Sequence, residues 1–201
     1  MPKISIIIPI HDMKNGAFFL WRAVNSIMAQ TFKDYEIIVT KEGSMPVNTN
    51  AGIKKAKGDL IKILYMDDWF AHSNSLKEIV DAMEFHSQYV SDERKFAQKW
   101  LITGSSTNLK PCWTEDIHSG NNKLGSPSSL TMRRRFALLF DENMSWLLDC
   151  DLYRRLYDTY GKPIILEGAN VNIGIHDGQA TNLMSDDYKL SEHEYMQKKY
   201  A

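Results

Sequence analysis

An almost unbroken apolar stretch near the N-terminus, residues 4–10, constrains the fold more than any other part of the chain. Five of its seven residues are isoleucine. A strand that is apolar on both faces needs cover on both faces, as strands in parallel sheets have. Further β-branched stretches alternate with segments of helical periodicity, which is typical of a mostly parallel sheet flanked by helices. The sequence therefore predicts an α/β fold.

The periodicity of the apolar residues predicts the order of the elements. Strands are expected at residues 4–10, 35–40, 60–64, 99–104, 164–167 and 170–175. Helices are expected at residues 17–30, 44–58, 75–88, 147–160 and 186–201. Residues 105–129 are polar and rich in Gly, Ser, Asn and Pro, so we expect a long functional loop there that orders over a ligand.

Composition limits the class of protein. With 201 residues, 43% of them hydrophobic, the chain suits one domain with a substantial core. Its 24 Lys and Arg residues against 25 Asp and Glu create no overall field that would recruit nucleic acid or an anionic membrane. No apolar run approaches the roughly 20 residues of a membrane span and no signal-peptide pattern is present, which favours a cytoplasmic protein. Cys112 and Cys150 form no CxxC pair, so neither zinc nor a disulfide framework is indicated.

Two adjacent carboxylates follow the strand expected at residues 60–64, in the tetrapeptide Tyr65-Met66-Asp67-Asp68. Open α/β sheets bind ligands beyond the carboxyl ends of their strands. Paired carboxylates at that place suit Mg²⁺ or Mn²⁺ carrying substrate phosphates. A solvated turn would use the same residues, so the motifs around them have to decide between the two interpretations.

Several motifs, taken in order, resemble those of family 2 glycosyltransferases of the GT-A fold. In the first half the matching segments are Ser5-Ile-Ile-Ile-Pro-Ile-His-Asp, residues 30–39, Asn50-Ala51-Gly52 and Ala56-Lys57-Gly58-Asp59. In the second half they are Gly125-Ser126-Pro127-Ser128-Ser129, Met132-Arg133-Arg134, Phe140-Asp141-Glu142, and Leu148-Asp149-Cys150-Asp151-Leu152 with Arg155. The resemblance implies a single Rossmann-like GT-A domain at residues 1–182, with a nucleotide-sugar-binding half at 1–104 and an acceptor-binding, catalytic half at 105–182. Residues 183–201 are expected to form a helical tail.

The resemblance also implies a reaction and a set of site residues. The implied reaction is a metal-dependent, inverting transfer of a hexose or pentose from a nucleoside-diphosphate sugar to a hydroxyl acceptor. A UDP-sugar is the favoured donor, and Mn²⁺ or Mg²⁺ is the implied cofactor. Asp149 is the implied general base, Asp68 the implied metal ligand and His176 a second metal ligand. Donor contacts are implied at Pro9, His11, Asp12, Glu42, Asn50, Asp67 and Arg134.

Three positions depart from the family's pattern. Tyr65 stands where the family has the first acid of its metal motif, and Leu148 stands where a Glu often precedes the catalytic Asp. Lys41-Glu42-Gly43-Ser44 replaces a segment with paired acids, so recognition of the nucleotide base is expected to differ.

Alternatives stay open for the key residues. A helix that starts at residue 150 would make Asp149 its N-cap, and Asp151 would then be the next candidate for the base. A lone histidine such as His176 is often an ordinary hydrogen-bonding residue. For the whole chain the alternatives are a nucleotidyltransferase, a non-catalytic nucleotide-sugar-binding module and, less favoured, a cysteine hydrolase built from Cys150 and His176.

The acceptor is the least constrained part of the expected reaction. A growing glycan, a lipid-linked sugar reached at a membrane surface and a hydroxylated base in DNA are the candidates. The DNA candidate is suggested by the basic runs Lys54-Lys55-Lys57 and Arg133-Arg134-Arg135. The balanced net charge of the chain argues against it.

Overall fold

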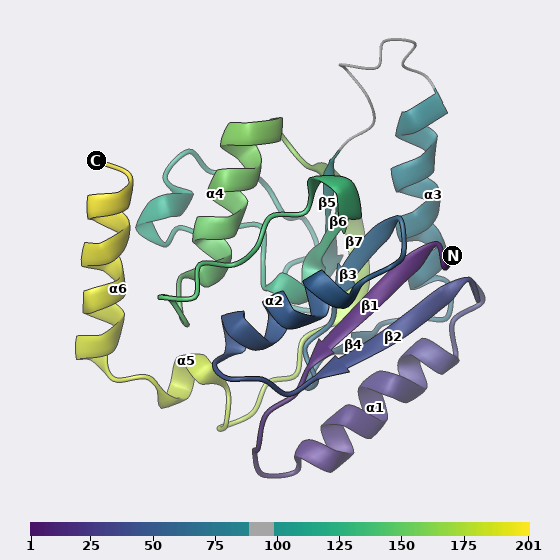
Figure 1. Ribbon diagram of the computed structural model, residues 1–201, viewed down its shortest axis with the longest axis horizontal. Coiled ribbons are helices and arrows are strands. Elements are labelled where there is room, and N and C mark those ends of the chain that lie inside the picture. The colour runs from purple at the N-terminus through teal and green to yellow at the C-terminus, as the bar shows by residue number, and fades with distance from the viewer. Residues whose placement is uncertain (89–98) are drawn as a thin grey trace.

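The computed structural model describes residues 1–88 and 99–201 and contains a seven-stranded sheet with helices on both faces (Figure 1). The strands are β1 (Ile4–Pro9), β2 (Tyr35–Thr40), β3 (Leu60–Ile63), β4 (Trp69–Phe70), β5 (Trp100–Ser105), β6 (Leu130–Arg133) and β7 (Ile164–Asn172). The helices are α1 (Gly16–Met28), α2 (Met45–Lys55), α3 (Ser75–Gln88), α4 (Leu148–Tyr160), α5 (Ala180–Leu183) and α6 (Asp186–Lys199). The predicted α/β fold is confirmed.

The strand order is β2-β1-β3-β6-β5-β7-β4. β1 pairs in parallel with β2 and β3, and β5 pairs in parallel with β7. β6 is antiparallel to both of its neighbours, β3 and β5, and β4 is antiparallel to β7. Five of the seven strands therefore run in one direction, and β4 and β6 run in the other. The sequence predicts neither of these two strands, which are short and lie outside the periodic segments.

Successive residues of β1 point into two different cores, one on each face of the sheet. Ile7 belongs to a core with Ile53 of α2 and Leu152 of α4. Ile6, its neighbour, belongs to a second core with residues of α1 and α3, among them Ala23. Both isoleucines are fully buried. The continuous apolar character of this strand is thus explained by helices that cover both of its faces.

The carboxyl ends of β1, β2 and β3 meet at one edge of the sheet. Because β6 runs in the opposite direction, its amino end lies at the same edge, next to the residues that follow β3. Ser128 makes the connection. Its hydroxyl oxygen accepts the N–H of Tyr65 at 2.9 Å, and its carbonyl accepts a hydrogen bond from the buried ammonium of Lys62. Two segments far apart in the sequence are thereby held together at this edge.

Gly104 lies where the backbones of β5 and β7 approach most closely. A Cβ at this position would lie 2.2 Å from the carbonyl oxygen of Gly168 and 2.8 Å from that of Leu109. Because backbone atoms cannot move aside, Gly104→Ala is expected to lower the free energy of unfolding by an amount near the top of the roughly 1–3 kcal/mol typical of overpacking. Urea unfolding measures the change.

Gly168→Ala is the matched control for this prediction. A Cβ at Gly168 would meet nothing within 4 Å, and only the backbone φ of 91° is strained. Such strain costs about 1–2 kcal/mol. Equal losses of stability in the two variants would contradict the steric explanation for Gly104.

Candidate active site

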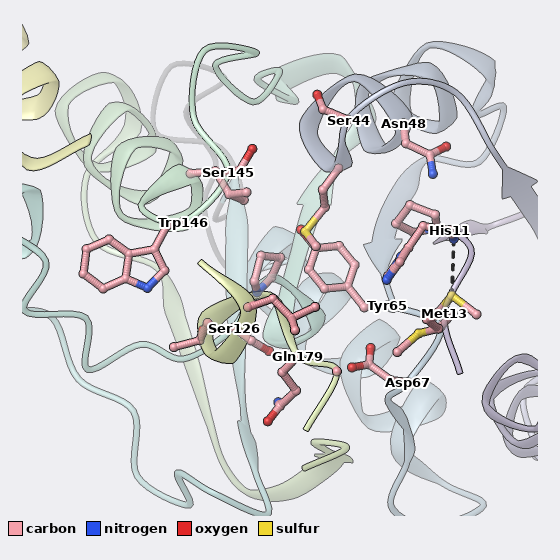
Figure 2. A pocket seen from close by; sticks show the side chains of 18 of the residues that line it. His11, Met13, Ser44, Asn48, Tyr65, Asp67, Ser126, Ser145, Trp146 and Gln179 are labelled. Carbon is pink, nitrogen blue, oxygen red and sulfur yellow. Dashed lines mark hydrogen bonds between the residues drawn. The ribbon is translucent and has the colours of Figure 1, made fainter. Parts of the chain in front are cut away.

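A cavity of about 530 Å³ opens at the carboxyl edge of the sheet (Figure 2). It is lined by Pro9, His11, Met13, Gly43, Ser44, Met45, Asn48, Tyr65, Met66, Asp67, Asp68, Ser126, Pro127, Ser145, Trp146, Leu148, Asp149, Ile173, Gly178, Gln179, Thr181, Leu183 and Met184. Figure 2 shows His11 and Met13 on one side of the cavity, and Ser145 and Trp146 on the opposite side. The two halves of the chain therefore face each other across this space.

Asp68 lines the cavity although only 3% of its surface is exposed. A turn directly after β3 orients it, with the Asp68 N–H donating to the Tyr65 carbonyl at 2.9 Å. Its Oδ1 accepts the N–H of Gly174 at 2.8 Å, and the Ser128 hydroxyl also hydrogen bonds to the carboxylate. Burial and the neighbouring Asp67 carboxylate raise the pKa of Asp68 to about 7. A cation bound beside it would favour the ionised form instead.

Asp67 is held from two sides. Its Oδ2 lies 3.0 Å from His176 Nε2, and its carbonyl accepts Arg22 Nη2 at 2.6 Å. The Arg22 guanidinium in turn lies 3.5 Å from the ring centroid of Trp69. His176 Nδ1 accepts the N–H of Gly178 at 3.1 Å, which places the proton of a neutral ring on Nε2, facing Asp67. Both ring nitrogens of His176 thus have partners, and in this arrangement the ring orients Asp67.

Asp149 lies in the first turn of α4, which begins at Leu148 rather than at residue 150. The N-cap is Leu147, so the alternative in which Asp149 caps the helix is wrong. Its Oδ1 accepts the N–H of Cys150 at 2.7 Å, and its Oδ2 accepts Asn122 Nδ2 at 2.9 Å. Burial raises the pKa of Asp149 to about 6, although these hydrogen bonds oppose the shift. A carboxylate that faces a cavity with such a pKa has the properties of a general base.

Asp151, the alternative base, is not among the residues that line the cavity. It is fully buried and bonded to three side chains. Its Oδ1 lies 2.7 Å from both Lys199 Nζ and the Tyr200 hydroxyl, and its Oδ2 accepts Arg155 Nε at 2.8 Å. This carboxylate therefore joins α4 to the C-terminal segment.

The donor contacts expected from the sequence fall into two groups. Those that line the cavity are Pro9, His11 and Asp67. Asp12 and Glu42 lie outside it, although each follows a strand that ends at the cavity. The side chain of Asp12 is 91% exposed and pairs with Lys41 at 2.7 Å, and Glu42 pairs with Lys55 at 2.6 Å. Both side chains therefore point to solvent.

Asn50 and Arg134, the other two expected donor contacts, hold backbone segments together. Asn50 is buried, where its Oδ1 accepts the N–H of Phe140 at 2.8 Å. Asn48, half a turn earlier on α2, lines the cavity instead. Arg134 lies at the opposite edge of the sheet, where its Nε donates to the Gly58 carbonyl at 2.9 Å. Neither side chain reaches the cavity.

Several residues that line the cavity are not predicted from the sequence. Gln179 and Met184 come from the segment between β7 and α6, which shows no periodicity. Asn122 lies in the polar stretch at 105–129, where composition indicates a functional loop without indicating which residue matters. Trp146 could have been predicted from the sequence, because it lies three residues before the candidate base and an aromatic ring can stack on a sugar.

Two further observations bear on the expected cofactor and location. Among the side chains that the structure describes, no three His, Cys, Asp or Glu residues lie close enough together to hold a metal ion by themselves. Among the helices of the same ranges, none is long and apolar enough to cross a membrane.

Solved structures with a similar fold include glycosyltransferases. S. aureus TarS 1–349 in complex with UDP-GlcNAc matches with a TM-score of 0.69 and 15% identity, over 92% of this chain and 63% of that one. The mannosyltransferase PcManGT from Pyrobaculum calidifontis, in complex with GDP-Man and Mn²⁺, matches with a TM-score of 0.57 and 10% identity, over 88% of this chain and 58% of that one. At these identities the likeness shows the fold. The chain has the GT-A glycosyltransferase fold, as the sequence predicts.

Sequence comparison finds homologues that are described as glycosyltransferases. An uncharacterized glycosyltransferase of Rickettsia typhi is 25% identical over an alignment of 228 positions, which covers 90% of this chain and 66% of the relative. An uncharacterized glycosyltransferase of Rickettsia conorii is 38% identical over 65 residues, which cover 32% of this chain and 10% of the relative. The chain thus spans less than two thirds of the length of these relatives. No protein-family model matches the chain.

The cysteine hydrolase alternative finds no support in the geometry. Cys150 is 2% exposed, and burial together with the Asp149 carboxylate raises the pKa of its thiol. A thiol of this kind is inert, because the thiolate is the reactive form.

Iodoacetamide is therefore expected to label the exposed Cys112 and to leave Cys150 unlabelled in the folded protein. Peptide mass spectrometry checks this, with urea-unfolded protein as the control in which both are labelled. Rapid labelling of Cys150 in the folded protein would revive the hydrolase alternative.

Proposed function

We propose that the protein is a metal-dependent, inverting glycosyltransferase of the family 2 type, which moves a sugar from a nucleoside-diphosphate sugar to a hydroxyl acceptor. The observation that carries this proposal is a single cavity lined both by the two acids after β3 and by Asp149 of α4. Residues 1–104 then supply the donor side of the site. Residues 105–182 supply the acceptor side and the base.

The charge of the cavity supports a role for a divalent cation. Among the described residues that line the cavity there are three aspartates and no lysine or arginine. A diphosphate that entered such a cavity alone would be repelled. Asp68 and Asp67 are suited to hold Mn²⁺ or Mg²⁺, because these ions are often bound by one or two carboxylates with substrate phosphates completing the shell. When bound, the ion would offset the charge that develops on the diphosphate leaving group.

The proposed base, Asp149, lines the same cavity from helix α4. In the proposed reaction Asp149 takes the proton of the acceptor hydroxyl as the hydroxyl oxygen attacks the anomeric carbon. The bond between that carbon and the diphosphate oxygen breaks in the same displacement, so the anomeric configuration is inverted. Asn122 and the N–H of Cys150 orient the carboxylate without neutralising it.

UDP is the favoured nucleotide, since the TarS fragment is described in complex with UDP-GlcNAc and with UDP. Pro9, His11 and Asn48 are the proposed donor contacts on the first half of the chain, because each lines the cavity. His176 is proposed to act on the metal through its hydrogen bond to Asp67. The sugar that is transferred is proposed only as a hexose or pentose.

The proposed acceptor is a hydroxyl group of a glycan or of a lipid-linked sugar. The arginines at 133–135, which suggest a DNA acceptor in the sequence, lie at the carboxyl end of β6, at the edge opposite to the cavity. Of the other basic run, Lys55 is paired with Glu42. No residue of either run lines the cavity, and no observation on the described residues favours the nucleotidyltransferase alternative. A non-catalytic nucleotide-sugar binder differs from the proposed enzyme only in turnover.

Asp68 is the first residue to test. Asp68→Ala removes the proposed metal ligand, so it is expected to weaken Mn²⁺-dependent binding of UDP by at least about tenfold while the fold persists. Titration calorimetry with UDP, with and without Mn²⁺, measures the effect. Asp81→Ala, on an exposed pair with Lys77 in α3, is the control and should bind as the parent does. Unchanged Mn²⁺-dependent affinity in Asp68→Ala would rule out Asp68 as a ligand.

Asp149→Asn tests the base. Asparagine is nearly isosteric and can still accept the Cys150 N–H, but it cannot take a proton. The transfer rate is therefore expected to fall by roughly a hundred- to ten-thousand-fold, with UDP affinity nearly unchanged. In the parent, transfer should also decline about tenfold per pH unit below about pH 6, because Asp149 is then protonated. A variant that transfers sugar within a few-fold of the parent would show that Asp149 is not the base.

A further inference from the structure

A short turn at residues 145–147 leads into helix α4, which begins at Leu148 and carries Asp149. The peptide N–H groups of this turn precede the helix, and all three find their acceptors on the carboxylate of Glu192 in α6. Its Oε1 accepts the N–H of Ser145 at 2.6 Å, and its Oε2 accepts those of Trp146 and Leu147 at 3.0 and 2.8 Å.

The Glu192 carboxylate is buried, with 3% of the residue exposed. A buried carboxylate is unfavourable unless other groups replace its hydrogen bonds to water. Here three peptide N–H groups do so, and the positive end of the α4 dipole favours the negative charge. Glu192 and Met196 are the buried residues of α6, so this carboxylate belongs to the face through which α6 docks.

The turn that Glu192 holds is part of the cavity wall. Ser145 and Trp146 both line the cavity, and Figure 2 shows them on the side opposite to His11 and Met13. The Trp146 ring also contacts α6, with the His193 ring edge-on at 5.2 Å between centroids and Lys189 Nζ at 5.8 Å from the Trp146 centroid. One helix therefore fixes both the backbone and the ring of this wall.

A second contact fixes the other end of α6. Lys199 Nζ lies 2.7 Å from Asp151 Oδ1, and it also pairs with Asp141 at 2.6 Å. The hydroxyl of Tyr200 donates to the same Asp151 oxygen at 2.7 Å. With anchors at two points on α4 and the turn before it, α6 cannot pivot without moving the start of α4.

We propose that Glu192 is a positioning residue, which holds the turn at 145–147 so that the Asp149 carboxylate and the Trp146 ring face the acceptor side of the cavity. This inference rests on the glycosyltransferase function proposed above, in which Asp149 takes the proton of the acceptor. Glu192 does not line the cavity, so it acts through Asp149 and Trp146. Helix α6 is thereby a part of the active site.

Hydrogen exchange tests the contact without any substrate. Glu192→Gln keeps the shape of the side chain but replaces one accepting oxygen by an NH2 group, which cannot accept a peptide N–H. The amides at 145–147 are expected to exchange at least about tenfold faster in this variant, because hydrogen bonds to a charged group are lost. Glu192→Ala should exchange faster still, with the amides of β1 and β3 unchanged. Glu194→Gln is the matched control, since Glu194 is exposed, lies on the same helix and loses the same charge.

Kinetics test whether the contact acts through the base. The probe is hydrolysis of radiolabelled UDP-GlcNAc with Mn²⁺, in which water takes the place of the acceptor. Glu192→Gln is expected to lower kcat at least about tenfold and to change the donor KM less than about twofold, because the donor contacts lie on the first half of the chain. In an Asp149→Asn background the same substitution should change the residual rate less than about twofold, because the group it positions is already gone.

Two outcomes would overturn the inference. One is exchange at 145–147 that stays as slow in both Glu192 variants as in Glu194→Gln. The other is a loss of kcat that is as large in the Asp149→Asn background as in the parent, which indicates a general loss of structure. If the parent turns over none of the nucleotide sugars supplied, the proposed function is contradicted, and the exchange experiment alone then decides whether Glu192 holds the turn.

Discussion

The reversed direction of β6 is the constraint on which the rest of the site depends. Its antiparallel pairing with β3 brings the amino end of β6 to the edge where β3 ends. Ser128 therefore reaches Tyr65 and Asp68, two residues that lie 60 or more positions earlier in the chain. If β6 ran parallel to its neighbours, this segment would lie at the opposite edge of the sheet. The acids after β3 would then face solvent, and no enclosed cavity would form between the two halves.

The enclosure has an electrostatic consequence. Asp68 and Asp149 both lose water around their carboxylates, and burial raises the pKa of each, to about 7 and about 6. Each carboxylate keeps a peptide N–H as a partner, from Gly174 and from Cys150, which prevents the larger shift that an isolated buried acid would show. The site thus holds two acids whose pKa values lie near neutral pH or about one unit below it. Asp68 is suited to bind a cation, which would displace its proton. Asp149 is suited to take a proton from an acceptor.

The sequence predicts the first half of the fold well and the second half less well, for identifiable reasons. Residues 35–40 match β2 at both ends, and the helix expected from residue 75 begins there as α3, because strong periodicity and clear turn signals mark both elements. β6 is only four residues long, and no local signal sets its direction. The strands expected at 164–167 and 170–175 are one strand, β7, since Gly168 bends it without ending it.

Site residues follow the same division between local and long-range information. Asp67, Asp68 and Asp149 lie beside elements that local patterns locate, whereas a contact such as that between Glu192 and the turn at 145–147 joins segments 45 or more residues apart. From the sequence, Glu192 is one acid among several on an exposed helix. Only the packing of α6 turns it inward, where its carboxylate accepts the N–H groups of the turn that precedes α4.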